Sequence, residues 1–114
     1  MLLVFLCMTS AYALADIIGI VQKVVDGDTI HLTDDNGKLH KVRLLGIDAP
    51  EMDQSFGFES REMLVNLVEG ERVIIDSRKR DRYKRILGKI YLDDIDVNLT
   101  MISKGLAWHY KRYR

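Results

Sequence analysis

The chain has 114 residues and a formal net charge of zero, which is enough for one domain with its own core and too little for two. Its single cysteine, Cys7, excludes an internal disulfide and a zinc site built on several thiolates. The charge is unevenly placed: residues 16–77 hold 6 basic and 13 acidic side chains, whereas residues 78–114 hold 11 basic and 4 acidic ones. The balanced total therefore conceals a basic part, which is compatible with either a solvated surface or polyanion binding.

Residues 1–15 carry no charge, and they combine an apolar stretch over residues 2–8 with a small-x-small triplet that ends at Ala15. This pattern predicts a secretory signal peptide whose removal leaves a mature chain starting near Asp16. Since no Lys or Arg precedes the apolar stretch, a buried first strand is the alternative interpretation. The stretch is too short to span a bilayer. We therefore expect a secreted or periplasmic protein with no membrane segment in its mature form.

Three strands are predicted in the first half of the mature chain. β-Branched and alternating apolar residues mark them, and turn-forming sequences at residues 26–28 and 34–37 separate them. The predicted strands cover residues 17–25, 29–33 and 39–45. They read as an antiparallel meander, which is followed by a loop over residues 48–55 that holds the single proline.

The second half mixes helices and strands. Apolar residues at helical spacing predict a helix over residues 57–69 that Gly70 ends, and Asp96 is placed to cap a short helix that ends at Gly105. Strands are predicted at 71–76 and 86–92, and the basic segment 78–85 between them is predicted to be a loop. The expected fold is mainly β with helices (α+β): a five-stranded Greek-key barrel of the OB type with two or three helices.

Two aspartates stand where predicted strands meet turns. Asp28 follows the first predicted strand and Asp48 the third, so their carboxylates can converge if the meander folds as expected. Carboxylates at close range repel each other unless a cation lies between them. Calcium prefers oxygen ligands, including backbone carbonyls, so these side chains and the carbonyl of Ala49 form a plausible site. The alternative for Asp26-Gly27-Asp28 is an ordinary turn.

Further side chains suit phosphodiester chemistry. Glu51 lies three residues beyond Asp48 and could position or deprotonate an attacking water. Arg43 interrupts an apolar strand, and a buried arginine needs a partner, which could be Asp28, Asp48 or a substrate phosphate. Arg43 and Arg85 are the residues expected to neutralise phosphate oxygens.

Aromatic residues of the basic half could stack on bases or bond a terminal phosphate, and the candidates are Tyr83, Tyr110 and Tyr113. Ordinary packing is the preferred interpretation for Tyr110 and Trp108. The three histidines, His31, His40 and His109, are expected to point outward from strands or tail and receive no role.

Three ordered motifs resemble the staphylococcal nuclease (thermonuclease) family. They are Val25-Asp26-Gly27-Asp28-Thr29-Ile30, then Val42-Arg43-Leu44-Leu45-Gly46-Ile47-Asp48-Ala49-Pro50-Glu51, then Asp81-Arg82-Tyr83-Lys84-Arg85, with weaker similarity at Val97-Asn98 and Gly105-Leu106-Ala107. The resemblance covers residues 17–113. It implies an OB barrel and a calcium-dependent endonuclease that hydrolyses DNA and RNA to 3′-phosphate and 5′-hydroxyl ends.

The resemblance also implies roles for individual residues. Asp28, Asp48 and the Ala49 carbonyl correspond to calcium ligands, Glu51 to the residue that activates or orients water, Arg43 and Arg85 to phosphate clamps, Asp26 to a group near the metal, and Tyr83 and Tyr113 to nucleotide contacts. Lys84 stands where the family commonly has glycine, so it adds a charge beside Arg85 and is expected to contact substrate.

The resemblance leaves the extent of the domain and one rival function open. The chain stops at Arg114, where family members usually continue into another helix, so the nuclease domain is expected to cover 16–114 without that helix and to be monomeric.

Single-stranded substrate is expected to be preferred, since its bases can stack on tyrosine. The main alternative is a non-catalytic OB-fold module that binds nucleic acid or peptide. A purely structural protein would leave Arg43 unexplained.

Overall fold

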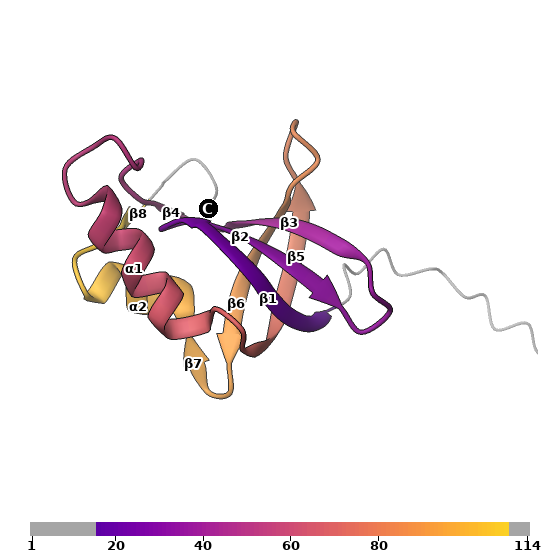
Figure 1. Ribbon diagram of the computed structural model, residues 1–114. Coiled ribbons are helices and arrows are strands. Elements are labelled where there is room, and N and C mark those ends of the chain that lie inside the picture. The colour runs from indigo at the N-terminus through magenta and orange to yellow at the C-terminus, as the bar shows by residue number, and fades with distance from the viewer. Residues whose placement is uncertain (1–15, 110–114) are drawn as a thin grey trace, which may run out of the picture.

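The computed structural model describes residues 16–109 and contains a closed five-stranded barrel (Figure 1). The predicted signal peptide, Tyr110 and Tyr113 lie outside the described residues. The barrel strands are β1 (Ile17–Asp26), β2 (Thr29–Asp34), β3 (Leu39–Leu44), β5 (Arg72–Arg80) and β6 (Ile86–Leu92). The first three form the predicted antiparallel meander, and β1 pairs with β5 and β5 with β6 in the same antiparallel sense. Parallel pairing of β3 with β6 closes the barrel and confirms the predicted fold class.

Two helices and three short strands complete the described part. They are α1 (Gly57–Val68), α2 (Val97–Ser103), β4 (Ile47–Asp48), β7 (Ile95–Asp96) and β8 (Trp108–His109). Both helices were predicted, and the side chain of Asp96 caps α2 by accepting a hydrogen bond from the Leu99 N–H at 3.0 Å. The short strands were not predicted, because each depends on a partner distant in sequence or on a tight turn. No helix within residues 16–109 is long and apolar enough to cross a membrane.

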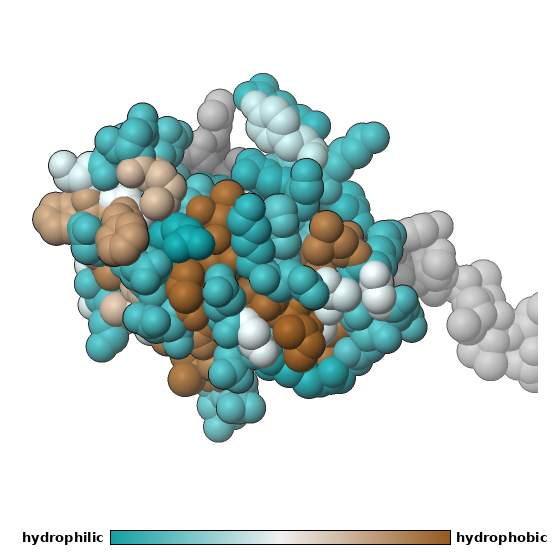
Figure 2. All heavy atoms as spheres, viewed as in Figure 1, coloured by the Kyte–Doolittle hydropathy of each residue, from teal (hydrophilic) through white to brown (hydrophobic). Residues whose placement is uncertain are grey.

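The core fills the barrel and the space beneath both helices, which lie on the same side of it in Figure 1. Alternation places one face of every strand inward, as in β5, where Val73 and Ile75 are buried and Ile74 is exposed. Leu64 and Val68 of α1 close one part of the core. Figure 2 shows a largely hydrophilic surface on this face, with apolar groups gathered around α1 and part of the barrel wall.

The basic segment is not the predicted loop. Strand β5 continues through Arg80, and its last residues pair with the start of β6, Lys79 with Leu87 and Arg80 with Ile86. Only residues 81–85 form the turn at the tip of this hairpin, which projects from the barrel in Figure 1. A run of charges is compatible with a strand here because these side chains are exposed while the backbone hydrogen bonds of the ladder are kept.

His40 also differs from the prediction. It is buried, and its ring Nε2 lies 2.8 Å from Oδ2 of Asp34. The register explains this position, because His40 is paired with the buried Leu32 and therefore shares its inward face. The sequence pattern alone did not establish which residues of this strand face inward.

Asn98 ties α2 to the barrel. Its side-chain oxygen accepts from the Ile90 N–H at 3.1 Å, and its amide group donates to Leu45 O at 2.9 Å and Gly88 O at 3.2 Å. Gly88 O also accepts a hydrogen bond from the Leu45 N–H at 2.9 Å. Asn98 therefore satisfies buried backbone groups on two separate segments.

We expect Asn98→Ala to lower the free energy of unfolding by about 2–4 kcal/mol, because three hydrogen bonds to backbone groups are lost from a buried position. The neighbouring Leu99 is exposed on the same helix, so Leu99→Ala serves as the control and should change stability by less than about 0.5 kcal/mol. Urea unfolding of both variants measures the difference. Equal stability of the two variants would contradict the role given to Asn98.

Candidate active site

The two aspartates singled out in the sequence lie beside the same arginine. Nη2 of Arg43 is 3.2 Å from Oδ2 of Asp28 and 3.1 Å from Oδ1 of Asp48. The Ala49 N–H donates to the same Asp28 oxygen at 2.9 Å. The β1–β2 turn, β3 and β4 thus each contribute to one cluster, which we call the Arg43 cluster: Asp28, Arg43, Asp48 and Ala49.

Local backbone structure brings these elements together. Arg43 is paired with Thr29 across β2 and β3, which places its strand next to the turn that carries Asp28. After β3 the chain turns at Gly46, whose φ of +79° is in the left-handed region that favours glycine, and continues as β4 with Asp48. A Cβ on Gly27 would collide with the Ser60 hydroxyl, so glycine there permits the β1–β2 turn to pack on α1.

Arg43 is 8% exposed and is surrounded by oxygen atoms. Besides the two carboxylates, its Nη1 donates to Ile47 O at 2.8 Å and to Leu44 O at 3.0 Å. These contacts identify the partners of the arginine that interrupts the apolar strand. Removing its side chain would leave the buried Asp28 without its counter-charge, which is strongly destabilising. Loss of activity in an Arg43 variant would therefore not separate catalysis from folding.

The cluster carries more negative than positive charge. Asp26 lies behind it, and its side chain accepts a hydrogen bond from the Asp28 N–H at 3.1 Å. Burial, together with the neighbouring Asp28, raises the pKa of Asp26 to about 6. Burial also raises the pKa of Asp48, although Arg43 opposes this shift. Two carboxylates beside one guanidinium, with the Asp26 carboxyl group hydrogen-bonded to the Asp28 backbone, form a region where an additional cation would be stabilised.

The available donors fit a hard divalent cation. Carboxylate oxygens of Asp28 and Asp48 lie close together, and the carbonyl of the adjoining Ala49 adds an oxygen of the type that calcium accepts. Within residues 16–109 no three His, Cys, Asp or Glu side chains gather as a complete metal-binding group. A metal held here would therefore depend on two carboxylates, a backbone carbonyl and water, which is compatible with calcium or magnesium rather than zinc.

Glu51 has a fixed backbone and an exposed side chain. Its N–H donates to the Gln54 side chain at 2.7 Å, and its carbonyl accepts from the Gln54 N–H at 2.9 Å. A Cβ on Gly57 would collide with the Glu51 carbonyl, so glycine at the start of α1 permits this close approach. The structure describes no hydrogen bond to the Glu51 carboxylate, which leaves it accessible to water.

Arg85 is the last residue of the β5–β6 turn and lies outside the Arg43 cluster. It immediately precedes Ile86, which is paired with Val42 of β3. Its guanidinium Nε donates to Asp81 Oδ2 at 2.8 Å, and its backbone N–H donates to the other oxygen of the same carboxylate at 3.0 Å. Among the described contacts none joins Arg85 to Asp28 or Asp48. A phosphate contact by Arg85 would require exchange of the Asp81 ion pair.

Tyr83 and Lys84 occupy the tip of the β5–β6 hairpin. The Tyr83 ring is 64% exposed and lies 5.1 Å from the Arg82 guanidinium and 5.4 Å from that of Arg85. Lys84 has a φ of +64°, so it adopts the conformation typical of the glycine that the family commonly has there. Both residues line a cavity of about 700 Å³ together with Lys38, Leu39, His40, Lys41 and Arg80. Its many cationic groups suit a polyanion.

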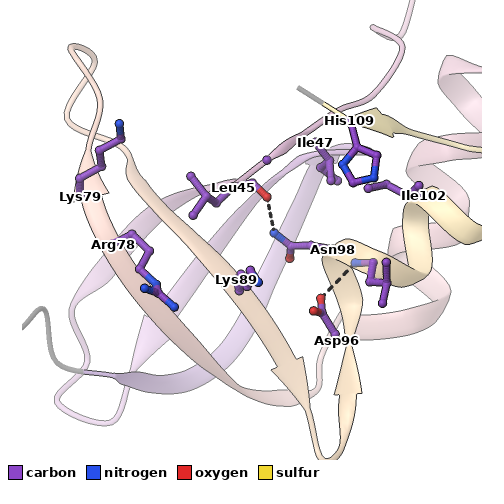
Figure 3. Close-up of a pocket in the computed structure, with 11 residues that line it drawn as sticks. Leu45, Ile47, Arg78, Lys79, Lys89, Asp96, Asn98, Ile102 and His109 are labelled. Atoms are coloured by element: carbon purple, nitrogen blue, oxygen red, sulfur yellow. Dashed lines mark hydrogen bonds between the residues drawn. The ribbon is translucent and has the colours of Figure 1, made fainter. Parts of the chain in front are cut away.

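A separate cavity of about 560 Å³ lies beside β4 and α2 (Figure 3). Its lining contains Arg78, Lys79 and Lys89, and also His109, which Figure 3 shows next to Ile47. Asn98 lies at its centre, but that side chain is occupied by backbone hydrogen bonds. This cavity was not predicted from the sequence, because strands and a helix far apart in the chain form its walls.

We expect Asp26→Asn to become more stable relative to the wild type as the pH rises. The pKa of Asp26 is about 6 in the folded protein and about 3.9 in the unfolded chain, so the folded state binds more protons between these values. Ionisation of Asp26 therefore lowers the stability of the wild type, while asparagine keeps the acceptor oxygen without the charge. Urea unfolding with chelator at about pH 4 and about pH 7 measures this. A stability difference that is the same at both pH values would contradict it.

Comparisons with known proteins agree with the geometry. A family model described as staphylococcal nuclease homologue matches residues 41–114. The chain is 46% identical over 100 residues to a protein of Escherichia coli named uncharacterized endonuclease, covering 87% of this chain and 65% of that protein. It is 36% identical over 115 residues to a micrococcal nuclease of Shigella flexneri, covering 93% and 66% respectively.

A protein of Haemophilus influenzae, also named uncharacterized endonuclease, is 42% identical over 93 residues, covering 82% of this chain and 52% of its own length. The chain thus spans between about half and two thirds of the length of these relatives. The family match covers more than half of the chain and includes Arg43, Asp48, Glu51 and Arg85. This chain belongs to the staphylococcal nuclease family.

Proposed function

We propose that the protein is a calcium-dependent nuclease that hydrolyses phosphodiester bonds in DNA and RNA and leaves 3′-phosphate and 5′-hydroxyl ends. The observation that carries this proposal is the convergence of Asp28 and Asp48 on Nη2 of Arg43, with the exposed Glu51 three residues further along the chain. The names of the relatives, endonuclease and micrococcal nuclease, support the reaction class.

Asp28, Asp48 and the Ala49 carbonyl would hold the calcium ion. Bound calcium would supply positive charge that stabilises the negative charge of the phosphate oxygens in the transition state. Asp26 would support this arrangement through its hydrogen bond to the Asp28 backbone. The excess of carboxylates over guanidinium groups in the cluster is compatible with this extra cation.

Glu51 would orient a water molecule and accept its proton while the water oxygen attacks phosphorus. The bond from phosphorus to the 5′ oxygen breaks, which leaves the phosphate on the 3′ side and a 5′-hydroxyl after that oxygen takes up a proton. Arg85 would exchange Asp81 for a phosphate oxygen, and Arg43 would hold the two aspartates while adding positive charge. Tyr83 and Lys84 would contact the nucleotide from the basic cavity.

Water as the nucleophile makes a 2′-hydroxyl unnecessary, so DNA and RNA are both expected as substrates. Single strands would be preferred because their backbone can bend into the site and their bases are free to stack.

We also propose that the protein acts as a monomer after export from the cytoplasm, by secretion or to the periplasm. The uncharged residues 1–15 support export.

We expect cleavage of plasmid and of denatured DNA in calcium and none with chelator. The alternative, a non-catalytic OB-fold module, would bind nucleic acid without cutting it, and this binding would persist with chelator. Gel analysis of the products and an electrophoretic mobility assay on the same samples separate the two. Intact DNA after long incubation in calcium, combined with chelator-insensitive binding, would favour the module.

We expect Glu51→Gln to lower kcat by about 10²-fold to 10⁴-fold, the range typical of a general base, while the stability is unchanged because the side chain is exposed. Asp53→Asn in the same exposed loop is the matched control and should retain wild-type kcat. Steady-state kinetics on a fluorescent oligonucleotide measures both variants. Wild-type turnover by Glu51→Gln would rule out this residue as the base.

A further inference from the structure

Trp108 is directly opposite Asp48. Strands β4 and β8 are antiparallel, and their register pairs Asp48 with Trp108 and Ile47 with His109. Side chains of directly opposed residues lie on the same face, with Cβ atoms about 5 Å apart. The indole therefore lies on the same face as the Asp48 carboxylate, which contacts Arg43. His109 and Ile47 lie on the other face, where they line the 560 Å³ cavity.

Trp108 is 53% exposed, so ordinary packing accounts for only part of its surface. Tryptophan is on average strongly buried, because its large ring gains most from leaving water. The preceding residue, Ala107, is buried, and alternation along β8 then directs Trp108 outward. An exposed aromatic ring beside this cluster offers a flat face on which a planar group can stack.

We propose that Trp108 is a base-stacking position of the active site, where a nucleobase adjoining the phosphate bound at the Arg43 cluster lies against the indole. This inference rests on the proposed nuclease function and adds a substrate contact to it. A base is one sugar away from its phosphate, so a phosphate held by Arg43 and the calcium ion brings a base within reach of the ring beside Asp48.

Stacking on an aromatic ring is tolerant of sequence, because every base has a π face. In a duplex the bases are already stacked on each other and cannot reach the indole without unpairing. Trp108 therefore favours single-stranded substrate without favouring one base. Tyr83 lies on the separate β5–β6 hairpin, so the two aromatic rings would contact different nucleotides of one strand.

Trp108 is the single tryptophan of the chain, so intrinsic fluorescence reports on this position alone. We would titrate the protein in calcium with a ten-nucleotide phosphorothioate strand, which resists cleavage, and with an abasic strand of the same length and charge. The base-bearing strand should quench the indole emission and bind at least about tenfold more tightly than the abasic strand. Equal affinity and equal emission for the two strands would overturn the proposal.

Variants test the same position in the reaction. Trp108→Ala should weaken binding of the base-bearing strand, measured by anisotropy, by about tenfold to a hundredfold and raise KM on single strands more than it lowers kcat. Trp108→Phe, which keeps an aromatic face, should restore most of the affinity, whereas Ile95→Ala, at an exposed position on β7, should behave as the wild type. Unfolding curves for all three verify that each variant is folded.

Failure of this inference can be told apart from failure of the proposed function. A wild-type protein that cleaves DNA while Trp108→Ala keeps its KM would overturn the stacking role and leave the nuclease intact. A wild-type protein that cleaves no nucleic acid would reject the nuclease. Concentration-dependent self-association that Trp108→Ala abolishes would show that the indole contacts another copy of the chain instead, and would also overturn the stacking role.

Discussion

The contact of the Arg43 guanidinium with two aspartates is the interaction on which this site depends. A buried guanidinium requires acceptors for its donors, and here they come from Asp28, Asp48 and the carbonyls of Leu44 and Ile47. To supply them, the chain must turn after β3 so that the Ile47 carbonyl and Asp48 of β4 reach the arginine. The contacts that satisfy the buried charge therefore also set how close the two carboxylates lie.

The closed barrel makes this arrangement rigid. Strand β3 is hydrogen-bonded on one side to β2 and on the other to β6, so Arg43 projects from a strand with no free edge at that point. Glycines permit the close approaches that the surrounding turns need, at Gly27 against Ser60 and at Gly57 against the Glu51 carbonyl. Unlike the residues of the Arg43 cluster, Glu51 has an exposed side chain, although hydrogen bonds to Gln54 hold its backbone in place.

The two signs of charge are separated in space as well as in sequence. Carboxylates gather behind and beside Arg43, whereas cations line the β5–β6 hairpin and the cavity that contains Tyr83. The cationic hairpin would attract a polyanion. A metal cation bound at the Arg43 cluster would reduce the repulsion between that polyanion and the carboxylates. Within the hairpin, the Asp81 carboxylate accepts hydrogen bonds from the turn backbone and also pairs with Arg85.

By itself, the sequence determined the barrel class, the first three strands, both helices and the clustering of Asp28, Arg43 and Asp48. These features follow from local signals, which are the periodicity of apolar residues, the turn residues and an arginine within an apolar strand. Tertiary structure alone decided four other features: the length of β5, the burial of His40, the engagement of Arg85 by Asp81 and the exposure of Trp108 beside Asp48. Each depends on the register between segments or on competition among possible partners. A strand's alternation shows that it has two faces, but only the strands paired with it decide which face is buried and what each side chain contacts.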